Sequence, residues 1–410
     1  ILLLALGCSE SITPPKSLVN GEHLHHLYEA FEEDDQEIGS IWIYCEAPDY
    51  LLVTDEDEGY TCVDDVARSL VFYVNEYKVK PNDSLLTKIT TLTNFILDMQ
   101  SEDAFFYNFI FPDKSINKTH KNSVAQPNWW SWRAFWALSE LALLEESELI
   151  ELQQAADEAM EKLLPYMLRV CQKNETDYSV EGISGPACIE DIGSDQVALL
   201  VIGLTNYYQK NDNPAIKQQL ARLGQILMRQ QLGDANTFPF YASMSWQNIW
   251  HAWGNSQAYA LIKAGNAIHN EEMVYAGIRE VENFYPYYLK ERLSHFVLKK
   301  NEGEFEILEK ERYPQIAYNL RPMIYATLEA YKIEPKDLYS DLAIELGNWF
   351  FGNNQADAMM YDLESGRTYD GIVSASQINK NSGAESTIEA LLSLQAINKY
   401  PEIRDSLKIK

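Results

Sequence analysis

The sequence has few cysteines and lacks the short motifs of common cofactor sites. Five cysteines occur in 410 residues, and no two of them form a CxxC pair, so neither a zinc site nor a redox motif is indicated. A GxGxxG loop, a P-loop and an HExxH motif are also missing. Although an exported protein permits disulfides, we expect the four scattered cysteines to be free or buried: Cys45, Cys62, Cys171 and Cys188.

Positive charge is also scarce. The chain has 33 basic and 61 acidic residues, which gives a net charge of −28. A nucleic-acid-binding protein needs a positive surface to displace the counterions of the phosphates. The composition therefore excludes DNA, RNA and anionic membrane surfaces as expected partners.

One apolar run stands at the start of the chain, where "ILLLALGCSES" leads into a polar stretch with two prolines. The run is too short to span a bilayer and looks like the end of a signal peptide. It resembles a bacterial lipobox, with Ala5 where Leu is usual and Cys8 as the lipidated residue. We therefore expect residues 1–20 to be leader and linker, and residues 21–410 to form a single domain. A plain secreted or buried segment is the alternative.

What the sequence does contain is helical periodicity from residue 21 onward. Apolar residues recur at i, i+3, i+4 and i+7 between short loops rich in Gly, Pro and Asn. The predicted helices are 22–35, 63–77, 84–100, 129–145, 148–171, 191–209, 213–231, 247–269, 271–291, 313–332, 336–351 and 383–398. Residues 39–55 and 103–113 are expected to be short strands or irregular segments.

Every second helix begins with a polar or aromatic cluster and continues with small and apolar residues, as buried helices do. The starts are marked by Asp64, Ser131, Asp191, Ala252, Ala317 and Glu385, which recur about every 64 residues. This period predicts an all-α fold, a closed toroid of six helical hairpins with minor β excursions. The inner helices of such a ring all run the same way, so their N-terminal ends meet at one mouth.

The six starts carry carboxylates, aromatic rings, amides, a histidine and arginines. The catalytic candidates are Asp64, Asp65, Asp191 and Glu385. The candidates for substrate binding are Trp129, Trp130, Glu190, His251, Trp253, Asn255, Tyr318, Asn319 and Arg321. Aromatic faces stack on the apolar faces of a sugar ring while polar groups bind its hydroxyls, so this set predicts a carbohydrate pocket.

Helix capping is the ordinary alternative for the acids. Thr61 precedes Asp64 by three residues, and Ser382 and Glu385 have the spacing of a capping box. Acidic residues in a first turn also gain from the helix dipole. Capping does not account for the aromatic and amide clusters at the other starts.

The spacing of residues on a helix leads to two further expectations about these clusters. Asp191 and Asp195 are four residues apart, so they would repel each other on one helix face unless a ligand or metal shares their charge. Trp129 and Trp130 are consecutive, so at most one of them is expected to face the pocket.

The combination of elements and motifs resembles the six-hairpin glycosidase superfamily, whose members fold as an (α/α)6 toroid. The motifs that carry the resemblance are "DDVARS", "WWSWRAFWAL", "WGNSQAYAL" and "SGAESTIEALLSL". The resemblance covers most of the chain after residue 21 as architecture and element order. It implies an active site at the N-terminal ends of the inner helices, with Asp or Glu as general acid and base.

A glycoside hydrolase needs one protonated and one ionised carboxyl. Asp64 and Asp65 are too close together to be that pair, so the partner is expected from another helix, either Asp191 or Glu385. One of the two adjacent aspartates is expected to face the pocket while the other caps the helix or binds Arg68. The substrate would be an oligosaccharide or polysaccharide.

Two other functions remain open. One is a polysaccharide lyase or an epimerase of uronic acids or other sugars. With a uronic acid it would use Tyr318 or His251 as base, and Arg321 or Arg133 would neutralise the sugar carboxylate. A surface lipoprotein that only binds glycans would keep the aromatic residues without needing the acids. We expect a monomer without a cofactor, with Ca²⁺ among the acids left open. The expected location is outside the cytoplasm, lipid-anchored in the periplasm or at the cell surface.

Overall fold

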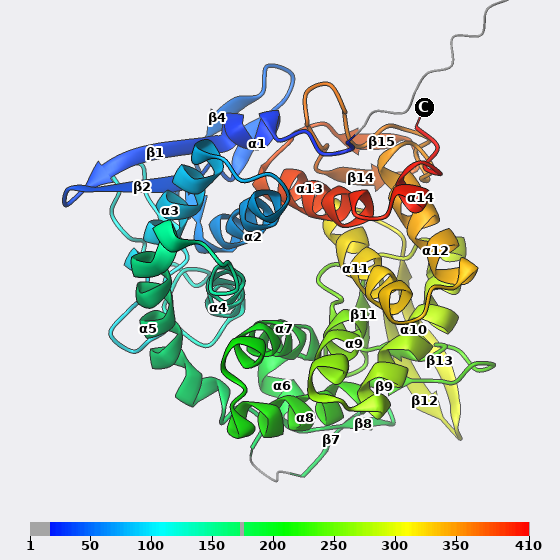
Figure 1. Ribbon diagram of the computed structural model, residues 1–410. Helices are drawn as coiled ribbons and strands as arrows, with labels where there is room; N and C mark the ends of the chain where they lie inside the picture. The colour runs from blue at the N-terminus through cyan, green and yellow to red at the C-terminus, as the bar shows by residue number, and fades with distance from the viewer. Residues whose placement is uncertain (1–16, 173–175, 410) are drawn as a thin grey trace, which may run out of the picture.

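The computed structural model describes residues 17–172 and 176–409. The predicted lipobox and Cys8 lie outside these residues. Helices dominate the described chain, and strands are short and scattered (Figure 1). Within the described ranges, none of the helices combines the length and apolarity needed to cross a bilayer.

Six inner helices surround the axis of a ring (Figure 1). They are α2 (Val63–Val79), α4 (Trp129–Leu141), α7 (Ser194–Asn211), α9 (Gln257–Ile268), α11 (Ala317–Ile333) and α13 (Ala384–Asn398). Each packs against the next in this order, and α13 packs back against α2, so the ring is closed. The toroid of helical hairpins that the period predicts is therefore confirmed.

Five outer helices pack around the inner ring. They are α3 (Asp83–Asp98), α5 (Ile150–Met167), α8 (Pro214–Met228), α10 (Glu271–Glu291) and α12 (Asp337–Gly347). The sixth outer position holds two short helices that pack on α13, namely α1 (Glu22–Leu27) and α14 (Pro401–Arg404). The sixth hairpin is thus completed by both ends of the described chain.

The predicted helix 22–35 is wrong after residue 27. The chain enters β1 (Tyr28–Glu33), which pairs antiparallel with β2 (Gln36–Ile41). Asp34 and Asp35 connect the two strands at φ 48 and 63°, the left-handed conformation that a two-residue hairpin turn requires. Turn chemistry therefore outweighs helical periodicity here.

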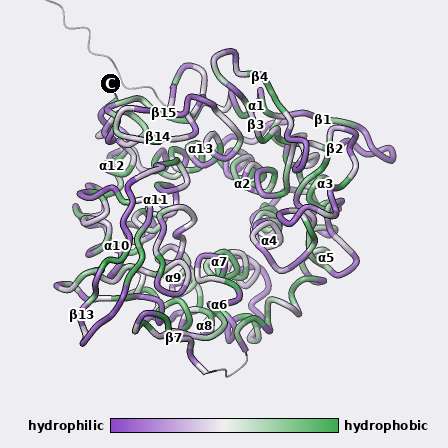
Figure 2. Tube along the Cα trace, turned by 180° about the vertical axis from the view of Figure 1, so that it is seen from behind, coloured by the Kyte–Doolittle hydropathy of each residue, from purple (hydrophilic) through white to green (hydrophobic). Residues whose placement is uncertain are grey.

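The two predicted kinds of helix are present. The inner helix α7 buries residues on all sides, whereas the outer helix α8 buries a single stripe that includes Ile216, Leu220, Leu223 and Leu227. A one-sided stripe at this spacing is the pattern of a surface helix. Hydropathy along the chain shows the same contrast, with hydrophilic colour on outer segments such as β13 (Glu304–Glu311) (Figure 2).

Short β-hairpins occupy the connections between hairpins of the ring. The remaining strands are β3 (Tyr44–Glu46), β4 (Leu51–Val53), β5 (Thr61–Cys62), β6 (Phe109–Ile110), β7 (Tyr178–Val180), β8 (Ile183–Gly185), β9 (Gln231–Leu232), β10 (Ala242–Ser243), β11 (Ile249–His251), β12 (His295–Asn301), β14 (Gly371–Ser374) and β15 (Gln377–Asn379). The segments predicted around 39–55 and 103–113 contain such strands. The β12–β13 hairpin has no counterpart among the predicted elements.

Three predicted inner helices begin too early, since helix 313–332 starts only at Ala317, the residue that marks it. Helix 247–269 is wrong in its first half, because β11 pairs there with β12 and Trp250 stacks on Phe296 with ring centroids 5.0 Å apart. Helix 191–209 is broken at Gly193, whose φ of 75° separates α6 (Cys188–Ile192) from α7. Ala252 and Asp191 therefore do not mark the starts of inner helices.

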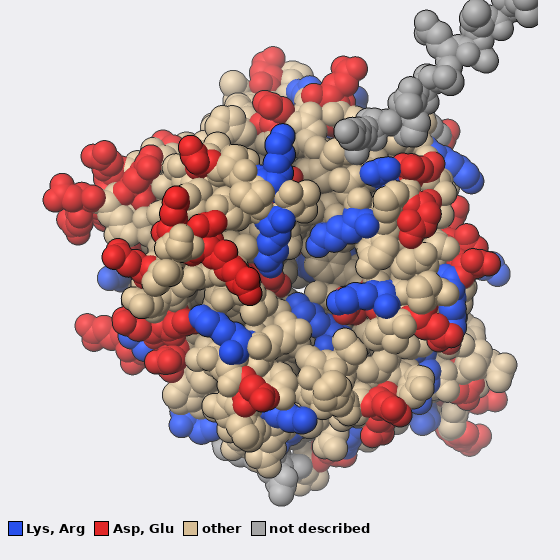
Figure 3. Space-filling view, in the orientation of Figure 1, with Lys and Arg blue, Asp and Glu red and all other residues tan. Residues whose placement is uncertain are grey.

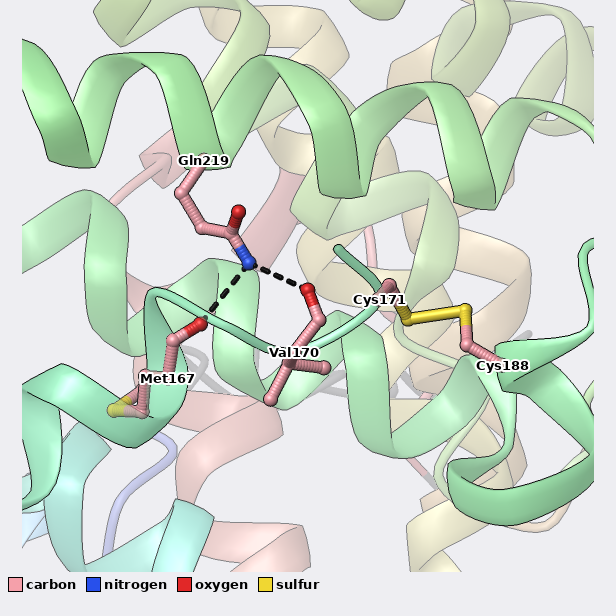
Figure 4. The surroundings of a disulfide bond; sticks show 5 residues. All are labelled: Met167, Val170, Cys171, Cys188 and Gln219. Atoms are coloured by element: carbon pink, nitrogen blue, oxygen red, sulfur yellow. Dashed lines mark hydrogen bonds between the residues drawn. A yellow bond between two sulfur atoms is a disulfide. The ribbon is translucent and has the colours of Figure 1, made fainter. Parts of the chain in front are cut away.

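Cys171 and Cys188 form a disulfide, so the expectation that they are free is wrong, whereas Cys45 and Cys62 are free and buried (Figure 4). Packing of the chain after α5 against α6 brings the two Cα atoms within 5.4 Å. Beside the bond, the Gln219 side-chain amide donates to the carbonyl oxygens of Met167 and Val170, at 3.0 and 2.8 Å. Sequence spacing alone does not reveal this pairing.

Candidate functional site

The N-terminal ends of α2, α4, α11 and α13 border two adjoining cavities. The larger has a volume of about 360 Å³, and its lining includes Asp64, Trp129, Trp130, Arg133, Trp253 and Tyr318. The smaller, of about 220 Å³, shares Tyr318 and Glu385 with it. We call this region the N-terminal mouth.

Asp64 borders the larger cavity from the first turn of α2. Its Oδ2 lies 2.7 Å from Nη1 of Arg133, and its Oδ1 has no hydrogen-bond partner among the described residues. The capping interpretation is wrong, because the helix has no side-chain cap and the Thr61 hydroxyl accepts from the Ile41 amide instead. One carboxylate oxygen of Asp64 is thus anchored and the other is uncommitted.

Asp65 is buried beneath this surface. Arg68 Nη2 donates to its Oδ1 at 2.6 Å, and the Cys62 thiol donates to its Oδ2 at 3.2 Å. Burial raises the pKa of Asp65, and the neighbouring Arg68 guanidinium partly offsets this. The two expected roles are thus assigned: Asp65 binds Arg68, and Asp64 borders the cavity. Arg68 contacts Asp64 only at the main-chain carbonyl oxygen of that residue.

Glu385 enters the mouth from the first turn of α13. Its Oε2 lies 3.1 Å from Nη1 of Arg68, and its side chain is 46% exposed. Desolvation by the surrounding protein raises the pKa of Glu385, and Arg68 opposes this shift. The predicted capping box is wrong, because α13 has no side-chain cap and the Ser382 hydroxyl accepts from the Thr368 amide.

Glu389 was missed by the sequence reasoning. It follows Glu385 by one helical turn and is fully buried between Arg68 Nη1 at 3.0 Å and Arg321 Nε at 2.5 Å. Burial by itself would raise the pKa of Glu389, but Arg321 and Arg68 outweigh it and lower the pKa. The i, i+4 repeat of acids in "ESTIEALL" is the signal that would have indicated it.

Tyr318 lies among three guanidinium groups. Arg133 Nη2 donates to its hydroxyl at 2.9 Å. The guanidinium carbons of Arg68 and Arg133 lie 5.5 Å, and that of Arg321 5.2 Å, from the centre of its ring. Gly254, at φ 70°, lets the loop before α9 approach, since a Cβ there would lie 3.1 Å from the Tyr318 hydroxyl.

The charges of this cluster do not balance when every group is ionised. Its carboxyl groups outnumber its guanidinium groups by one; the members are Asp64, Asp65, Glu385 and Glu389 against Arg68, Arg133 and Arg321. A buried excess charge is unfavourable, so one carboxyl is best accommodated as its neutral acid. Burial raises the pKa of both Asp65 and Glu385, but Asp65 accepts two hydrogen bonds, which favour its ionised form, whereas Glu385 accepts one and its side chain is 46% exposed. Glu385 is therefore the best-placed proton carrier.

Aromatic rings border the larger cavity on two sides. Trp129 lies under the Arg133 guanidinium, at 5.2 Å, and Trp130 donates from Nε1 to the Phe106 carbonyl oxygen at 2.7 Å. Both tryptophans line the cavity, so the expectation that only one faces it is wrong. Trp253 lines it as well.

His251 stacks on Trp253, with ring centroids 4.2 Å apart. Its Nε2 lies 3.2 Å from Asp195 Oδ2, and its Nδ1 lies 2.7 Å from the Trp253 carbonyl oxygen. Both ring nitrogens therefore face oxygen acceptors. These contacts hold the indole of Trp253 in place at the edge of the cavity.

Glu190 and Asp191 lie elsewhere. Both are exposed on α6, and Asp191 borders a separate cavity beside the disulfide, with Tyr166 and Cys188. The expected same-face pair of Asp191 with Asp195 is wrong, because Gly193 ends one helix before the next begins. Of the two expected partners for Asp64, only Glu385 lines a cavity with it.

The other predicted binding residues are buried. Asn255 donates to the Ser243 carbonyl oxygen at 3.2 Å, and Arg321 is committed to Glu389. Asn319 is fully buried, and none of its side-chain atoms has a hydrogen-bond partner in the described chain. Instead, Asn108 and Asn122 line the larger cavity, from a segment whose irregular sequence gives no periodic signal.

In the part of the chain that the structure describes, no group of three or more His, Cys, Asp or Glu residues is arranged to hold a metal ion. The acids of the mouth are paired with arginines instead. Whether Ca²⁺ binds remains a prediction.

No protein-family model matches the chain, and no curated protein matches its sequence. Solved structures do resemble it. A sugar epimerase from a ruminal bacterium has a TM-score of 0.62 at 13% identity, over 91% of this chain and 94% of that one. The cellobiose 2-epimerase of Spirochaeta thermophila has a TM-score of 0.59 at 12% identity, over 87% and 90%.

A GH76 α-mannanase from Bacteroides thetaiotaomicron has a TM-score of 0.54 at 10% identity, over 84% of this chain and 88% of that one. The names of these neighbours give different activities, and each of the named activities is on a carbohydrate. At such low identity the likeness concerns the fold. The chain thus shares the (α/α)6 toroid fold with these enzymes.

Proposed function

We propose that the protein is a carbohydrate-active enzyme, a glycoside hydrolase that cleaves an oligosaccharide or polysaccharide at the N-terminal mouth. The observation that carries this proposal is the pair Asp64 and Glu385 in one cavity, each held by a different arginine. Glycoside hydrolysis needs two carboxyls whose environments push their protonation states apart. Glu385 is the general acid, and Asp64 is the base or nucleophile.

The chemistry follows from these environments. Glu385 donates its proton to the glycosidic oxygen while the bond from that oxygen to the anomeric carbon breaks. The carboxylate of Asp64 either takes a proton from an attacking water or bonds to the anomeric carbon itself. Arg133 holds Oδ2 of Asp64 at 2.7 Å and so fixes the orientation of the carboxylate.

Substrate binding falls to the rings and amides around the two carboxyls. Trp129 and Trp253 offer faces on which sugar rings stack, and Asn108 and Asn122 offer groups that bind hydroxyls. Lipidation at Cys8, export and a position at the periplasmic or outer face of a membrane are part of the same proposal. We also propose that the protein acts as a monomer.

An epimerase or lyase is the second candidate, favoured by the Tyr318 hydroxyl that Arg133 holds within the cavity. A tyrosine beside a guanidinium is suited to move a proton at a sugar carbon. Arg133 would have to neutralise a uronate, because Arg321 is committed to Glu389. Each of the three guanidinium groups is already paired with a carboxylate, so none is free to bind an anionic substrate, and this candidate ranks second.

The test is a panel of plant, host and microbial glycans with products followed by NMR. New reducing ends report hydrolysis, a stereoisomer without new ends reports epimerisation, and an unsaturated sugar reports elimination. Asp64→Asn is expected to lower kcat about 10³-fold, since acid–base groups contribute roughly 10²–10⁴-fold. Asp341→Asn, on an exposed face of α12, is the matched control and should hydrolyse normally.

Hydrolysis by Asp64→Asn and Glu385→Gln at the wild-type rate would refute the proposal. Epimerisation or elimination by the wild type, without new reducing ends, would replace it with the second candidate. Glycan binding without any product would identify a binding lipoprotein. The anomer released first separates an inverting from a retaining mechanism.

A further inference from the structure

The opposite end of the ring also contains a cavity, which plays no part in the proposed function. Its volume is about 290 Å³, and residues from the C-terminal halves of the inner helices line it. All six inner helices contribute to this C-terminal mouth, through Asn75, Trp136, Asn206, Lys263, Tyr325 and Gln395 among others. Most of its lining residues are polar or charged, and Trp136, Tyr259, Tyr325 and Tyr400 add aromatic rings, so the cavity suits a polar ligand.

The charge of this mouth differs from that of the whole chain. Its lining holds three lysines and two glutamates: Lys263, Lys332, Lys399, Glu140 and Glu329. Figure 3 shows Lys and Arg side chains gathered around the central hollow of one face of the ring, although the net charge of the chain is −28. A local excess of positive charge in an acidic protein favours an anionic ligand.

Most of these charges are paired. Glu140 lies 3.6 Å from Lys263, and Lys78 beside the cavity lies 3.5 Å from the same carboxylate. Burial would raise the pKa of Glu140, but the two lysines outweigh it and lower the pKa to about 2. Glu329 pairs with Lys332 at 3.2 Å. Lys399 alone of the lining lysines has no ion pair within the described residues, so one cationic group is available.

Uncommitted hydrogen-bonding atoms accompany Lys399. Trp136 Nε1 and Gln395 Oε1 belong to residues that line the cavity, and neither has a partner in the described chain. Trp136 is 3% and Gln395 is 4% exposed, so these atoms are not satisfied at an open surface. Tyr259 and Tyr325 add two aromatic rings in edge-to-face contact, with centroids 5.2 Å apart.

A wall of buried side chains lies between the two mouths. The Arg321 guanidinium lies 5.2 Å from the ring centre of Tyr318 in the N-terminal mouth and 5.3 Å from that of Tyr325 in the C-terminal mouth. Its partner Glu389 is fully buried. The C-terminal mouth is therefore a site of its own rather than an extension of the first.

From this geometry we propose that the C-terminal mouth binds a sugar that carries one carboxylate, such as a hexuronic acid. Lys399 pairs with the carboxylate, the tyrosine and tryptophan rings contact the sugar ring, and the amides of Asn75, Asn266 and Gln395 bind its hydroxyls. The proposal uses only residues of this cavity and is independent of the chemistry at the N-terminal mouth.

The test is calorimetric titration of the whole chain with D-glucuronate and with D-glucose, its neutral counterpart. Glucuronate is expected to bind at least tenfold more tightly than glucose. Lys399→Met should lower the affinity for glucuronate at least tenfold and leave that for glucose unchanged. Lys217→Met, which removes an exposed lysine on α8, is the matched control and should bind like the wild type.

Two further variants assign the binding to one mouth. Trp253→Ala alters only the N-terminal mouth and should keep glucuronate binding, whereas Tyr325→Ala removes a ring that contacts the sugar and should weaken the binding of both sugars several-fold. Equal affinity for the two sugars, no glucuronate binding at millimolar concentration, or wild-type binding by Lys399→Met would each overturn the proposal. Loss of binding in Trp253→Ala with retention in Lys399→Met would move the site to the N-terminal mouth and overturn it equally.

Discussion

The two mouths of the ring are built from the same six helices but carry opposite chemistry. The N-terminal mouth gathers carboxylates that arginines hold in a buried network. The C-terminal mouth gathers lysines, tyrosines and amides around two glutamates, Glu140 and Glu329. The difference shows that the direction of the inner helices, common to all six, divides the molecule into two chemical environments.

The helix macrodipole gives a physical reason for this division. Anionic groups are stabilised at helix N-terminal ends and cationic groups at C-terminal ends, by about 0.3–1 kcal/mol each at exposed sites. Asp64, Asp65 and Glu385 lie in first turns, and Lys78 and Lys332 lie in last turns. Because the six inner helices run the same way, the preference for anionic groups adds up at the N-terminal mouth and the preference for cationic groups adds up at the C-terminal mouth.

Removing the proposed general acid of the N-terminal mouth should lower the activity far more than a change at the C-terminal mouth does. Glu385→Gln is expected to lower kcat/KM about 10²–10³-fold, since general acids contribute in this range. Because desolvation raises the pKa of Glu385, the wild-type rate should hold through the ordinary range of glutamate titration and fall only at higher pH, as the acid loses its proton.

The measurement is kcat/KM against pH for wild type and variant. The alkaline decline should disappear in Glu385→Gln, which has no proton to lose. A decline that persists unchanged in the variant would assign it to another group. Glu329→Gln, at the other mouth, should keep the wild-type profile.

The next largest effect concerns stability. Glu389→Gln leaves Arg68 and Arg321 buried without their shared carboxylate, and breaking a buried ion pair costs about 3–5 kcal/mol in the free energy of unfolding. Glu329→Gln removes a partner of the exposed Lys332, so its cost should stay below about 1 kcal/mol. Urea unfolding of both variants measures the difference, and similar losses at the two mouths would contradict the comparison.

The smallest effect is expected from a change to Trp253, one of the tryptophans that line the larger cavity of the N-terminal mouth. Trp253→Ala removes one stacking face and should raise KM about tenfold, equivalent to about 1.4 kcal/mol, with kcat little changed. The exposed Trp246 is a matched control, because Trp246→Ala removes an indole that does not line the N-terminal mouth. A fall in kcat without a change in KM would indicate that Trp253 acts on the reacting groups through His251.

Periodicity in the sequence was sufficient to predict the ring. Buried helices reveal themselves by small and apolar residues on all sides, and surface helices by one apolar stripe, so the alternation of the two kinds is visible without coordinates. Starts with strong local signals were also placed correctly, as at Asp64, Ser131, Ala317 and Glu385. Where local signals conflict, prediction failed, as at Gly193 and at the Asp34–Asp35 turn.

The sequence by itself therefore determined the all-α ring, the direction of its inner helices and the presence of Asp64, Trp253, Tyr318 and Glu385 at one mouth. Only the tertiary structure decided which aspartate binds Arg68, that Glu389 joins Arg68 to Arg321, and that Asp191 lies at another cavity. The reason is the range of the interactions. Helix periodicity is read within a few residues, whereas Glu389 joins arginines from helices far apart in the chain, and distance and burial together set the strength of such ion pairs.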